Sequence, residues 1–380
     1  MEHLYLDAAS TEPVGGNVIS VMMPFLTEAY ANPMSVHSAG KTAARALEAA
    51  RGSIAADLGA RPDDVIFTSG GTEADNLAIK GIAMARIRLL REAYGEQVRP
   101  RVIVSSIEHP AVLESVRWME RWFGCEVVEI PVDHQAHIDL DALRAELAQS
   151  DLDSSSDSVS GTSGKPCNCT LLVSTMLANN EVGTVEPVNE IARIAHEHGV
   201  PLHVDAVQAA GHVAIDVKAE NIDMLSISAH KFHGPKGVGA LYARRGIPLV
   251  NVIEGGAQER GKRAGTENIG GIVAMAAALS EACANLEKNE AYVSALRDKL
   301  IAGLKTIPHA ALNGDETKRL PGNVNFCFEG IEGESLLLLL DEAGICASSG
   351  SACTSGSLDP SHVLLAIGRP HEVAHGSLRL

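Results

Sequence analysis

Residues 226–237 read Ser226-Ile-Ser-Ala-His-Lys-Phe-His-Gly-Pro-Lys-Gly237 and carry Lys231 where an apolar strand enters a Gly/Pro loop. An earlier stretch, His203-Val-Asp-Ala-Val-Gln208, places Asp205 at the end of another apolar run. Parallel strands that alternate with helices end at the same edge of a sheet. We therefore expect Lys231 and Asp205 to lie close together.

A lysine and a carboxylate at neighbouring strand ends suit pyridoxal 5'-phosphate. The lysine amine forms a Schiff base with this cofactor, and the carboxylate keeps the pyridine nitrogen protonated so that the ring can accept electrons. Each residue alone has a simpler explanation, since Asp205 could cap a helix and Lys231 could be a surface charge. Their joint placement favours the cofactor site.

Residues 65–76 (VIFTSGGTEADN) predict a strand, a glycine turn and a helix that begins near Gly71 and Thr72. The N–H groups and the dipole of a helix N-terminus attract anions, so this turn suits the cofactor phosphate. An ordinary capped turn is the common alternative. Ser228 and His230, on either side of Lys231 in the chain, would supply further phosphate donors.

Three more polar residues follow predicted strands or turns. His109 precedes a predicted helix and could stack on the cofactor ring and move protons, although a satisfied loop histidine is an equally good interpretation. Gln208 lies one turn beyond Asp205 and could reach the cofactor's phenolic oxygen. Asn180 lies in a polar turn, where binding residues often occur, although turn formation alone would also explain it.

Cys353 lies in Ser348-Ser-Gly-Ser-Ala-Cys-Thr-Ser-Gly356, a loop of small residues that would suit a mobile nucleophile. The alternative is an incidental loop cysteine. The presence of Lys231 in the same chain favours the nucleophile. Cys327, in Asn-Phe-Cys-Phe, is predicted to be a core thiol instead. Lys231, Asp205 and Cys353 together predict a pyridoxal phosphate enzyme that uses a cysteine in its chemistry.

Composition limits the alternatives. The chain of 380 residues has a formal net charge of −17, which argues against binding to nucleic acid or to anionic lipid. Its N-terminus lacks the basic and apolar regions of a signal peptide, and its apolar runs are too short for a membrane span. Seven cysteines, an odd number without framework spacing, indicate free thiols and a cytoplasmic location.

The order of the predicted elements favours an α/β fold with a mainly parallel sheet and a smaller α+β domain. We assign residues 15–258 to the large domain, and residues 1–14 and 259–380 to the small domain that carries the cysteine loop. The predicted strands are Val65–Ser69, Val102–Ser105, Val127–Ile130, Leu171–Thr175, Leu202–Asp205, Met224–Ser228, Ala240–Ala243 and Asn323–Phe328. The predicted helical stretches are Thr72–Leu90, Pro110–Phe123, Glu186–His198, Ile272–Ile307 and Gly333–Glu342.

Residues 150–168 are predicted to form a surface loop. Their first part, SDLDSSSDSVSGTSGK, has too little apolar content to pack in a core. Cys167 and Cys169 follow as a C-x-C pair. Two ligands do not complete a zinc site, so we interpret them as incidental exposed thiols, with a metal or redox role as the alternative.

Two other motifs resemble binding patterns of different protein classes. His371-Glu-Val-Ala-His375 matches the H-E-x-x-H pattern of zinc proteases. Pro370 and Gly376 leave barely one and a half helical turns, and no third ligand follows before Leu380, so we expect no metal site. Residues 234–239 resemble a dinucleotide glycine motif only loosely, because they lead into a strand and not a helix.

The chain as a whole resembles the cysteine desulfurases of the NifS/IscS type, and its motifs are most similar to those of the NifS branch. The resemblance rests on Tyr5-Leu-Asp, Asn32-Pro-Met-Ser-Val-His37, Thr68–Asn76, Glu108-His-Pro-Ala-Val, Asn179-Asn-Glu-Val-Gly, His203–Gln208, Ser228–Gly237, Glu259–Asn268, Gly333-Glu and Ser348–Pro360. It implies the pyridoxal-phosphate-dependent transferase fold (fold type I) in a homodimer. It also implies the removal of sulfur from L-cysteine, which leaves alanine and a persulfide for an iron–sulfur scaffold protein or another acceptor.

The resemblance also implies roles for individual residues. Cys353 would accept the sulfur and, with a scaffold protein, would ligate an iron–sulfur cluster transiently. Thr266 would reach the phosphate of the other protomer's cofactor. Arg379 would bind the substrate α-carboxylate beside Asn180. The other implied residues keep the roles given above: Lys231, Asp205, Gln208, His109, Gly71, Thr72, Ser228 and His230.

Two features depart from the family pattern. The stretch at 150–168 is longer than usual, and in the family a further helical segment normally follows the position of Leu380 and would hold Arg379. An aminotransferase or a selenocysteine lyase of the same fold remains an alternative function. Neither of these activities needs a loop cysteine.

Overall fold

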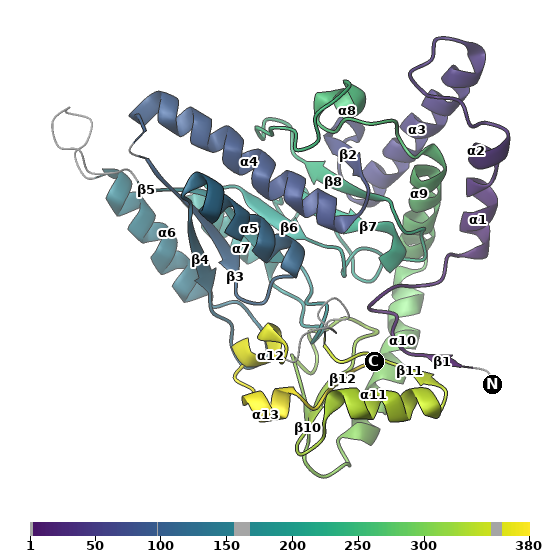
Figure 1. Ribbon diagram of the computed structural model, residues 1–380, viewed down its shortest axis with the longest axis vertical. Helices are drawn as coiled ribbons and strands as arrows, with labels where there is room; N and C mark the ends of the chain where they lie inside the picture. Colours follow the sequence, from purple (N-terminus) through teal and green to yellow (C-terminus); the bar gives the residue numbers. More distant parts are fainter. Residues whose placement is uncertain (1–2, 97, 156–167, 351–358) are drawn as a thin grey trace.

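The computed structural model describes residues 3–96, 98–155, 168–350 and 359–380, without the side chains of residues 150–155 and 168. At its centre lies a seven-stranded sheet in the order β2-β8-β7-β6-β5-β3-β4 (Figure 1). Its strands are β2 (Val65–Thr68), β3 (Arg99–Ser105), β4 (Glu126–Ile130), β5 (Asn168–Met176), β6 (Leu202–Asp205), β7 (Met224–Ser228) and β8 (Gly239–Ala243).

Strand β8 runs antiparallel to both of its neighbours, β2 and β7, whereas β7, β6, β5, β3 and β4 are parallel. The segment between β7 and β8 is too short for the crossover that a parallel neighbour needs, so the chain turns back. The expected α/β class with a mainly parallel sheet is confirmed. The antiparallel β8 was not predicted.

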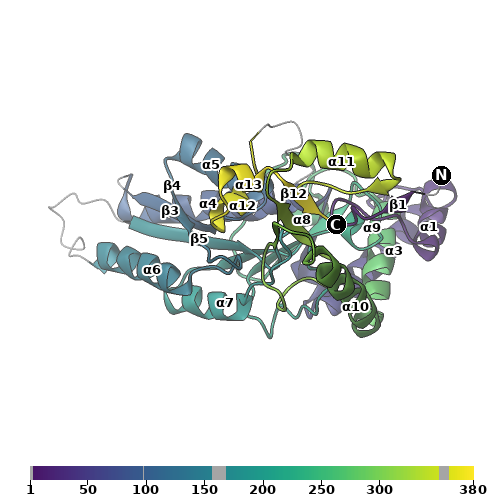
Figure 2. The same cartoon turned by 90° about the horizontal axis from the view of Figure 1, so that it is seen from below.

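Helices cover both faces of this sheet (Figure 2). Apolar side chains of α4 (Gly71–Tyr94) and α5 (Pro110–Phe123) form one core with the sheet. Those of α3 (Ser38–Asp57), α6 (Leu140–Ser155), α7 (Val188–Glu197) and α9 (Ile269–Ala284) form the other. Burial on both sides explains why the strands read as short apolar runs without alternation.

A second, three-stranded sheet has the antiparallel order β12-β10-β9, formed by Ser377–Arg379, Asn325–Phe328 and Ala310–Leu312. Phe326 and Phe328 pack with α10 (Leu286–Leu304) and α11 (Gly333–Glu342). Cys327 points to the other side, into a core with α12 (His362–Ala366) and α13 (His371–Ala374). Cys327 has no exposed surface, which confirms the predicted core thiol.

The remaining elements are short. Strand β1 (Leu4–Tyr5) pairs in parallel with β11 (Ile345–Cys346), so the first residues lie beside the C-terminal part of the chain. Helices α1 (Gly16–Met22) and α2 (Pro24–Thr27) precede α3, and α1 packs against α9. Two 3-10 turns, Pro62–Asp64 (η1) and Ala229–Lys231 (η2), and the short α8 (Gln258–Gly261) complete the described elements.

Two predicted segments differ from the structure. The helical stretch at 272–307 is divided at Asn285 into α9 and α10, which bend by 72°. Helix α6 continues to Ser155, so the start of the predicted loop at 150–168 is helical. The Asp139 side chain accepts hydrogen bonds from the N–H groups of Asp141 and Ala142, and a capped helix extends at little further cost. Residues 156–167, including Cys167, lie outside the described residues.

Helix α9, which we assigned to the small domain, packs against α1 and α3 beside the large sheet. Within the described part of the chain, no single helix is long and apolar enough to cross a membrane. The bent pair α9 and α10 passes that test only when the two helices are taken together. Helix α13, in the H-E-x-x-H motif, has four residues.

Candidate active site at the strand ends

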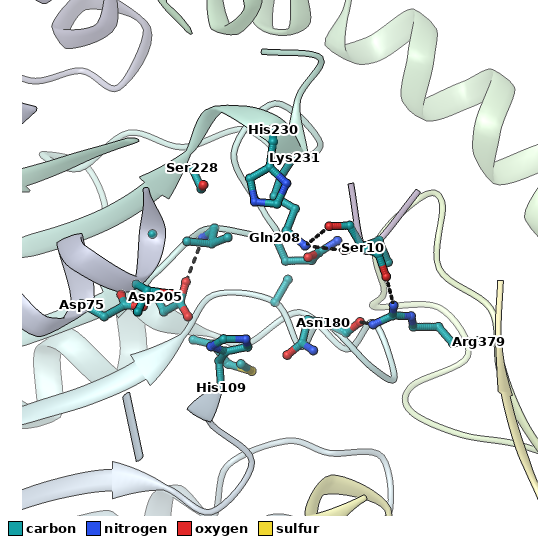
Figure 3. A pocket seen from close by; sticks show the side chains of 16 residues that line it. Ser10, Asp75, His109, Asn180, Asp205, Gln208, Ser228, His230, Lys231 and Arg379 are labelled. Atoms are coloured by element: carbon teal, nitrogen blue, oxygen red, sulfur yellow. Dashed lines mark hydrogen bonds between the residues drawn. The ribbon is translucent and has the colours of Figure 1, made fainter. Parts of the chain in front are cut away.

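A cavity of about 200 Å³ opens at the carboxyl ends of β5, β6 and β7. This edge is where ligands bind in open parallel sheets. The lining residues are Ala9, Ser10, Gly71, Thr72, Asp75, His109, Met176, Ala178, Asn180, Asp205, Val207, Gln208, Ser228, His230, Lys231 and Arg379. Figure 3 shows the labelled side chains around this space. The structure therefore brings together residues that lie as far apart in the chain as Ser10 and Arg379.

One end of the cavity is formed by the start of α4. Gly70, before the first helical residue, has a φ of 151°, a conformation that favours glycine. A Cβ on Gly71 would lie 2.5 Å from the Cγ2 atom of Val207, so the turn also needs glycine for close packing. Among the described residues, no side chain caps the N-terminus of α4. Its first N–H groups, together with Ser228 beside the turn and with His230, make a fitting cradle for a phosphate.

Asp205 lies at the floor of the cavity, at the last position of β6, and is 5% exposed. Its Oδ1 accepts a hydrogen bond of 2.9 Å from the N–H of Val207. Burial raises the pKa of Asp205 to about 6, while that hydrogen bond and the nearby Lys231 lower it. A carboxylate in this position would gain from a cationic partner, and a protonated ring nitrogen is one.

Lys231 ends the turn η2 that follows β7. Its Nζ donates to the backbone oxygens of Ala9 and Ser10, the latter at 3.0 Å. The N-terminal segment therefore holds the lysine amine at the cavity wall. His230, next to Lys231, lies 3.2 Å (Nδ1 to Oγ1) from Thr11. Burial, followed by the charges of Lys231 and Lys236, lowers the pKa of His230 to about 4.

His109 faces the cavity from the start of α5. Its Nδ1 accepts a hydrogen bond of 3.1 Å from the N–H of Ala111, so in the neutral ring the proton resides on Nε2. Burial, then Lys231 and His362, lower the pKa of His109 to about 4. At neutral pH this imidazole is uncharged and can lie flat against an aromatic ring.

The buried Oε1 atom of Gln208 has no hydrogen-bond partner among the residues that the structure describes. A buried polar atom without a partner is costly, and a ligand hydroxyl that donates to Oε1 would satisfy this amide oxygen. The orphan amide, the free N–H groups of the helix start and the buried carboxylate are three different polar groups. Together they fit the phenolic oxygen, phosphate and ring nitrogen of pyridoxal phosphate.

The opposite end of the cavity is built around Arg379, which is 2% exposed. Its Nη2 donates to the Asp7 carboxylate (3.1 Å) and the Ser10 hydroxyl (2.8 Å), and its Nη1 donates to the backbone oxygen of Asn180 (3.0 Å). Pairing of β12 with β10 fixes the backbone of Arg379. Sheet pairing and the N-terminal segment therefore hold this arginine in the described structure.

Asn180 is positioned by its neighbour. The Oδ1 of Asn179 accepts from the N–H groups of Glu181 and Val182, and its Nδ2 donates to the backbone oxygen of Ile107. These bonds tie the turn after β5 to the segment before His109. Asn179 therefore stabilises the turn, and Asn180 lines the cavity.

Of the predicted site residues that the structure describes, Thr266 alone does not line the cavity. It is exposed in the segment between α8 and α9. Cys353 lies outside the described residues. Sequence reasoning missed Asp7, Ser10 and Asp75. A signal for Asp75 existed, because it lies one helical turn after the predicted phosphate turn and would face the sheet.

Comparison with known proteins gives a consistent result. The sequence model of the family "Aminotransferase class-V" matches residues 4–380. "Cysteine desulfurase IscS" of Methanosarcina thermophila is 48% identical over 377 residues, which cover 99% of this chain and 86% of that protein.

Two solved structures extend this similarity to the fold. A "NifS-like protein" superposes with a TM-score of 0.85 at 34% identity and covers 100% of this chain and 93% of its own. "SspA in complex with cysteine" has a TM-score of 0.79 at 32% identity and covers 99% of this chain and 97% of its own. Both likenesses span the large sheet and the C-terminal sheet together.

Proposed function

The chain belongs to the class-V aminotransferase family, and we propose that it is a pyridoxal-phosphate-dependent cysteine desulfurase. The expected pyridoxal-phosphate-dependent transferase fold (fold type I) is confirmed by its likeness to NifS-like structures. The observation that carries the proposal is one cavity in which Lys231, Asp205 and a helix N-terminus face Arg379.

The cofactor end would hold pyridoxal phosphate through its three polar groups. The N-terminus of α4, with Gly71 and Thr72, would bind the phosphate together with Ser228 and His230. Asp205 would pair with the ring nitrogen, and Gln208 with the phenolic oxygen. When bound, the cofactor supplies an electron sink for negative charge that develops at the substrate α-carbon.

Lys231 would attach the cofactor through Nζ and, once displaced by the substrate amine, would carry the α-proton. The backbone oxygens of Ala9 and Ser10 give the displaced ammonium a place to donate. His109, uncharged at neutral pH, would stack on the ring and present Nε2–H to the reacting groups. Lys231 and His109 would therefore move protons, and Asp205 would stabilise the protonated ring nitrogen.

The substrate end would bind the amino acid's carboxylate. Arg379 lines the cavity, and its buried Nε has no hydrogen-bond partner among the described residues, so the guanidinium keeps a donor for a carboxylate oxygen. Asn180 beside it would add a side-chain amide. A related structure is titled as a complex with cysteine, which supports L-cysteine as the substrate here.

Cys353 would supply the nucleophile. Its thiolate attacks the substrate sulfur, the new S–S bond forms, and the substrate Cβ–S bond breaks. The electron pair of the broken bond stays with the carbon, which takes up a proton and becomes the methyl group of alanine. The sulfur remains as a persulfide on Cys353, so the step needs no external oxidant or reductant.

Assembly and partners follow from the same proposal. We infer a homodimer in which Thr266 reaches the phosphate at the partner's site, and a sulfur acceptor such as an iron–sulfur scaffold protein. We also infer a reducing cytoplasm, where the described thiols Cys125, Cys169, Cys283, Cys327 and Cys346 stay reduced. The division into residues 15–258 and the remainder is part of the proposal, as is similarity to the NifS branch.

The test is product analysis with L-cysteine and no keto acid. A desulfurase releases alanine in proportion to the sulfide formed when a reductant is present, whereas an aminotransferase needs a keto acid acceptor. A selenocysteine lyase would act on selenocysteine and leave L-cysteine largely unused. Either of these results would overturn the proposal.

The matched variants are Cys353→Ala and, as control, Cys283→Ala in α9. Cys353→Ala should still bind pyridoxal phosphate and change its absorption when L-cysteine is added, but it should release almost no alanine. Cys283→Ala should behave as the unmodified protein. Wild-type turnover in Cys353→Ala would contradict the assigned nucleophile.

A further inference from the structure

Asp75 is a second buried carboxyl beside Asp205. It lies on α4 just after the phosphate turn, is 1% exposed and lines the same cavity. Figure 3 shows the two acids next to each other at the floor. The Oδ1 atom of Asp75 has no hydrogen-bond partner among the described residues. The roles proposed above account for Asp205 and leave this second acid unexplained.

A row of polar side chains runs from Asp75 into the face of the sheet that α4 covers. The Ser226 hydroxyl on β7 hydrogen-bonds the Asp75 carboxyl and lies 2.9 Å from Nε2 of His203 on β6. The other ring nitrogen, Nδ1, lies 2.8 Å from the Ser174 hydroxyl on β5. His203, Ser226 and Ser174 have no exposed surface. We call Asp75, Ser226, His203 and Ser174 the buried chain.

The hydrogen bonds of the buried chain can run in either of two directions, because each hydroxyl has one proton to donate. If Asp75 holds a proton, it donates to Ser226, Ser226 donates to Nε2, and Nδ1–H donates to Ser174. If Asp75 is ionised, each of these donors and acceptors is exchanged. Burial lowers the pKa of His203 to about 3, so the ring is neutral in both cases and serves only as a relay.

The charges around Asp75 favour the first direction. Asp205 on β6 and Glu108 before α5 are acids, and neutral His203 approaches Oδ1 at 3.7 Å. Burial, then the charge of Asp205, raise the pKa of Asp75 well above its usual range. Lys231 stabilises the charge of Asp205. Two buried carboxyls this close share one negative charge, and the cation selects Asp205 to carry it.

We propose that Asp75 is a positioning residue: a neutral carboxylic acid that donates its proton into the buried chain and so keeps the single negative charge on Asp205, facing the cofactor nitrogen. The role of Asp75 toward the cofactor rests on the proposed function. The location of the proton itself can be tested on the cofactor-free protein.

The first test is infrared spectroscopy of the cofactor-free protein at neutral pH. The difference spectrum between the unmodified protein and Asp75→Asn should contain the C=O band of a protonated carboxylic acid, which deuterium exchange shifts. Ser226→Ala should keep that band at a shifted frequency, because the acceptor of the Asp75 proton is gone. A carboxylate band lost in Asp75→Asn, in place of the acid band, would overturn the proposal.

The second test compares the activity of Asp75→Ala with that of Asp75→Asn, which keeps the size and polarity of the side chain. Asp75→Ala removes the donor and leaves the Ser226 hydroxyl with His203 alone as its partner in the buried chain, so kcat/KM should fall about tenfold through kcat. Asp75→Asn, whose amide can donate to Ser226, should recover most of this loss. A larger loss in Asp75→Asn than in Asp75→Ala would contradict the neutral role. If the protein releases no alanine from L-cysteine, the proposed function fails while the infrared result still reports where the proton resides.

Discussion

The two ends of the cavity are built in different ways. The cofactor end takes Asp205 and Ser228 from the neighbouring strands β6 and β7 and Lys231 from the turn η2 after β7, within 27 residues of sequence. The substrate end joins Arg379 to Asp7 and Ser10, which are separated from it by 372 and 369 residues. The first end is a property of the sheet, whereas the second exists only when the two ends of the chain meet.

This difference has a chemical consequence. At the cofactor end the parallel ladder of β6 and β7 positions Asp205, so this buried carboxylate can keep its charge opposite one ring nitrogen. At the substrate end Arg379 is already paired with Asp7, and a substrate carboxylate must share that arginine. We therefore expect changes at the cofactor end to remove chemistry and changes at the substrate end to weaken binding.

Replacing the cofactor-end lysine should have the largest effect. Lys231→Ala removes both the covalent attachment point and the carrier of the α-proton, so turnover should fall by about 10³-fold or more. The characteristic visible absorption of the bound cofactor should also disappear. A borohydride-reducible protein–cofactor adduct that persists in this variant would contradict the assignment.

Replacing the substrate-end arginine should have a smaller and different effect. Arg379→Gln keeps a planar polar group without the charge, so kcat/KM for L-cysteine should fall by about 10²-fold, mainly through a higher KM. The absorption of the bound cofactor should be unchanged, which is the control. A loss of cofactor binding in this variant would show that the two ends are not separable.

The same contrast explains what the sequence predicted. Strands β6 and β7 and helices α5 and α11 were predicted at their observed bounds, because short apolar runs and capped amphipathic helices are local signals. The cofactor end followed from strand ends alone. The contact of Asp7 with Arg379 has no local signal, since it depends on how β1 and β12 meet the rest of the chain.

The buried polar chain marks a second limit. His203 and Asp205 alternate on one strand and were therefore on one face, but neither Ser174 nor Asp75 could be placed beside them without the strand order. The division of residues 272–307 at Asn285 and the continuation of α6 to Ser155 depend on packing and on helix propagation. Composition alone does not determine these boundaries.

Acidity at the cofactor end can be measured without catalysis. The pKa of Asp205, raised to about 6 in the fold, means that the native state binds its proton more tightly than the unfolded chain does. The stability of the cofactor-free protein should therefore be highest below about pH 4 on this account and fall as pH rises to about 6, a loss of roughly 3 kcal/mol.

Asp205→Asn isolates this contribution. The variant should be more stable than the unmodified protein at pH 7 and about equal to it near pH 4, as measured by denaturant unfolding after cofactor removal. Lys231→Ala should enlarge the loss in the unmodified background, since it removes the nearby cation. A variant that is less stable at pH 7 would show that the Asp205 carboxylate stabilises the empty fold.

The smallest effect is expected for a deletion in the segment at residues 150–165. Residues 150–165 have a Ser/Asp-rich composition that predicts no contribution to the core. Deleting residues 156–165, beyond the end of α6, should change the thermal midpoint by no more than about 2 °C and leave kcat/KM for L-cysteine unaffected. A large loss of stability would show that this segment packs against the sheet.

The most direct measurement of the central claim is mass spectrometry of peptides from the purified protein after one turnover with L-cysteine. The account predicts one added sulfur atom on the peptide that contains Cys353, removable by a reductant, and one alanine released per sulfur. It predicts no added sulfur when Lys231→Ala is treated in the same way. A persulfide that maps to Cys167, Cys169 or Cys327, or alanine released without any protein-bound sulfur, would contradict the account.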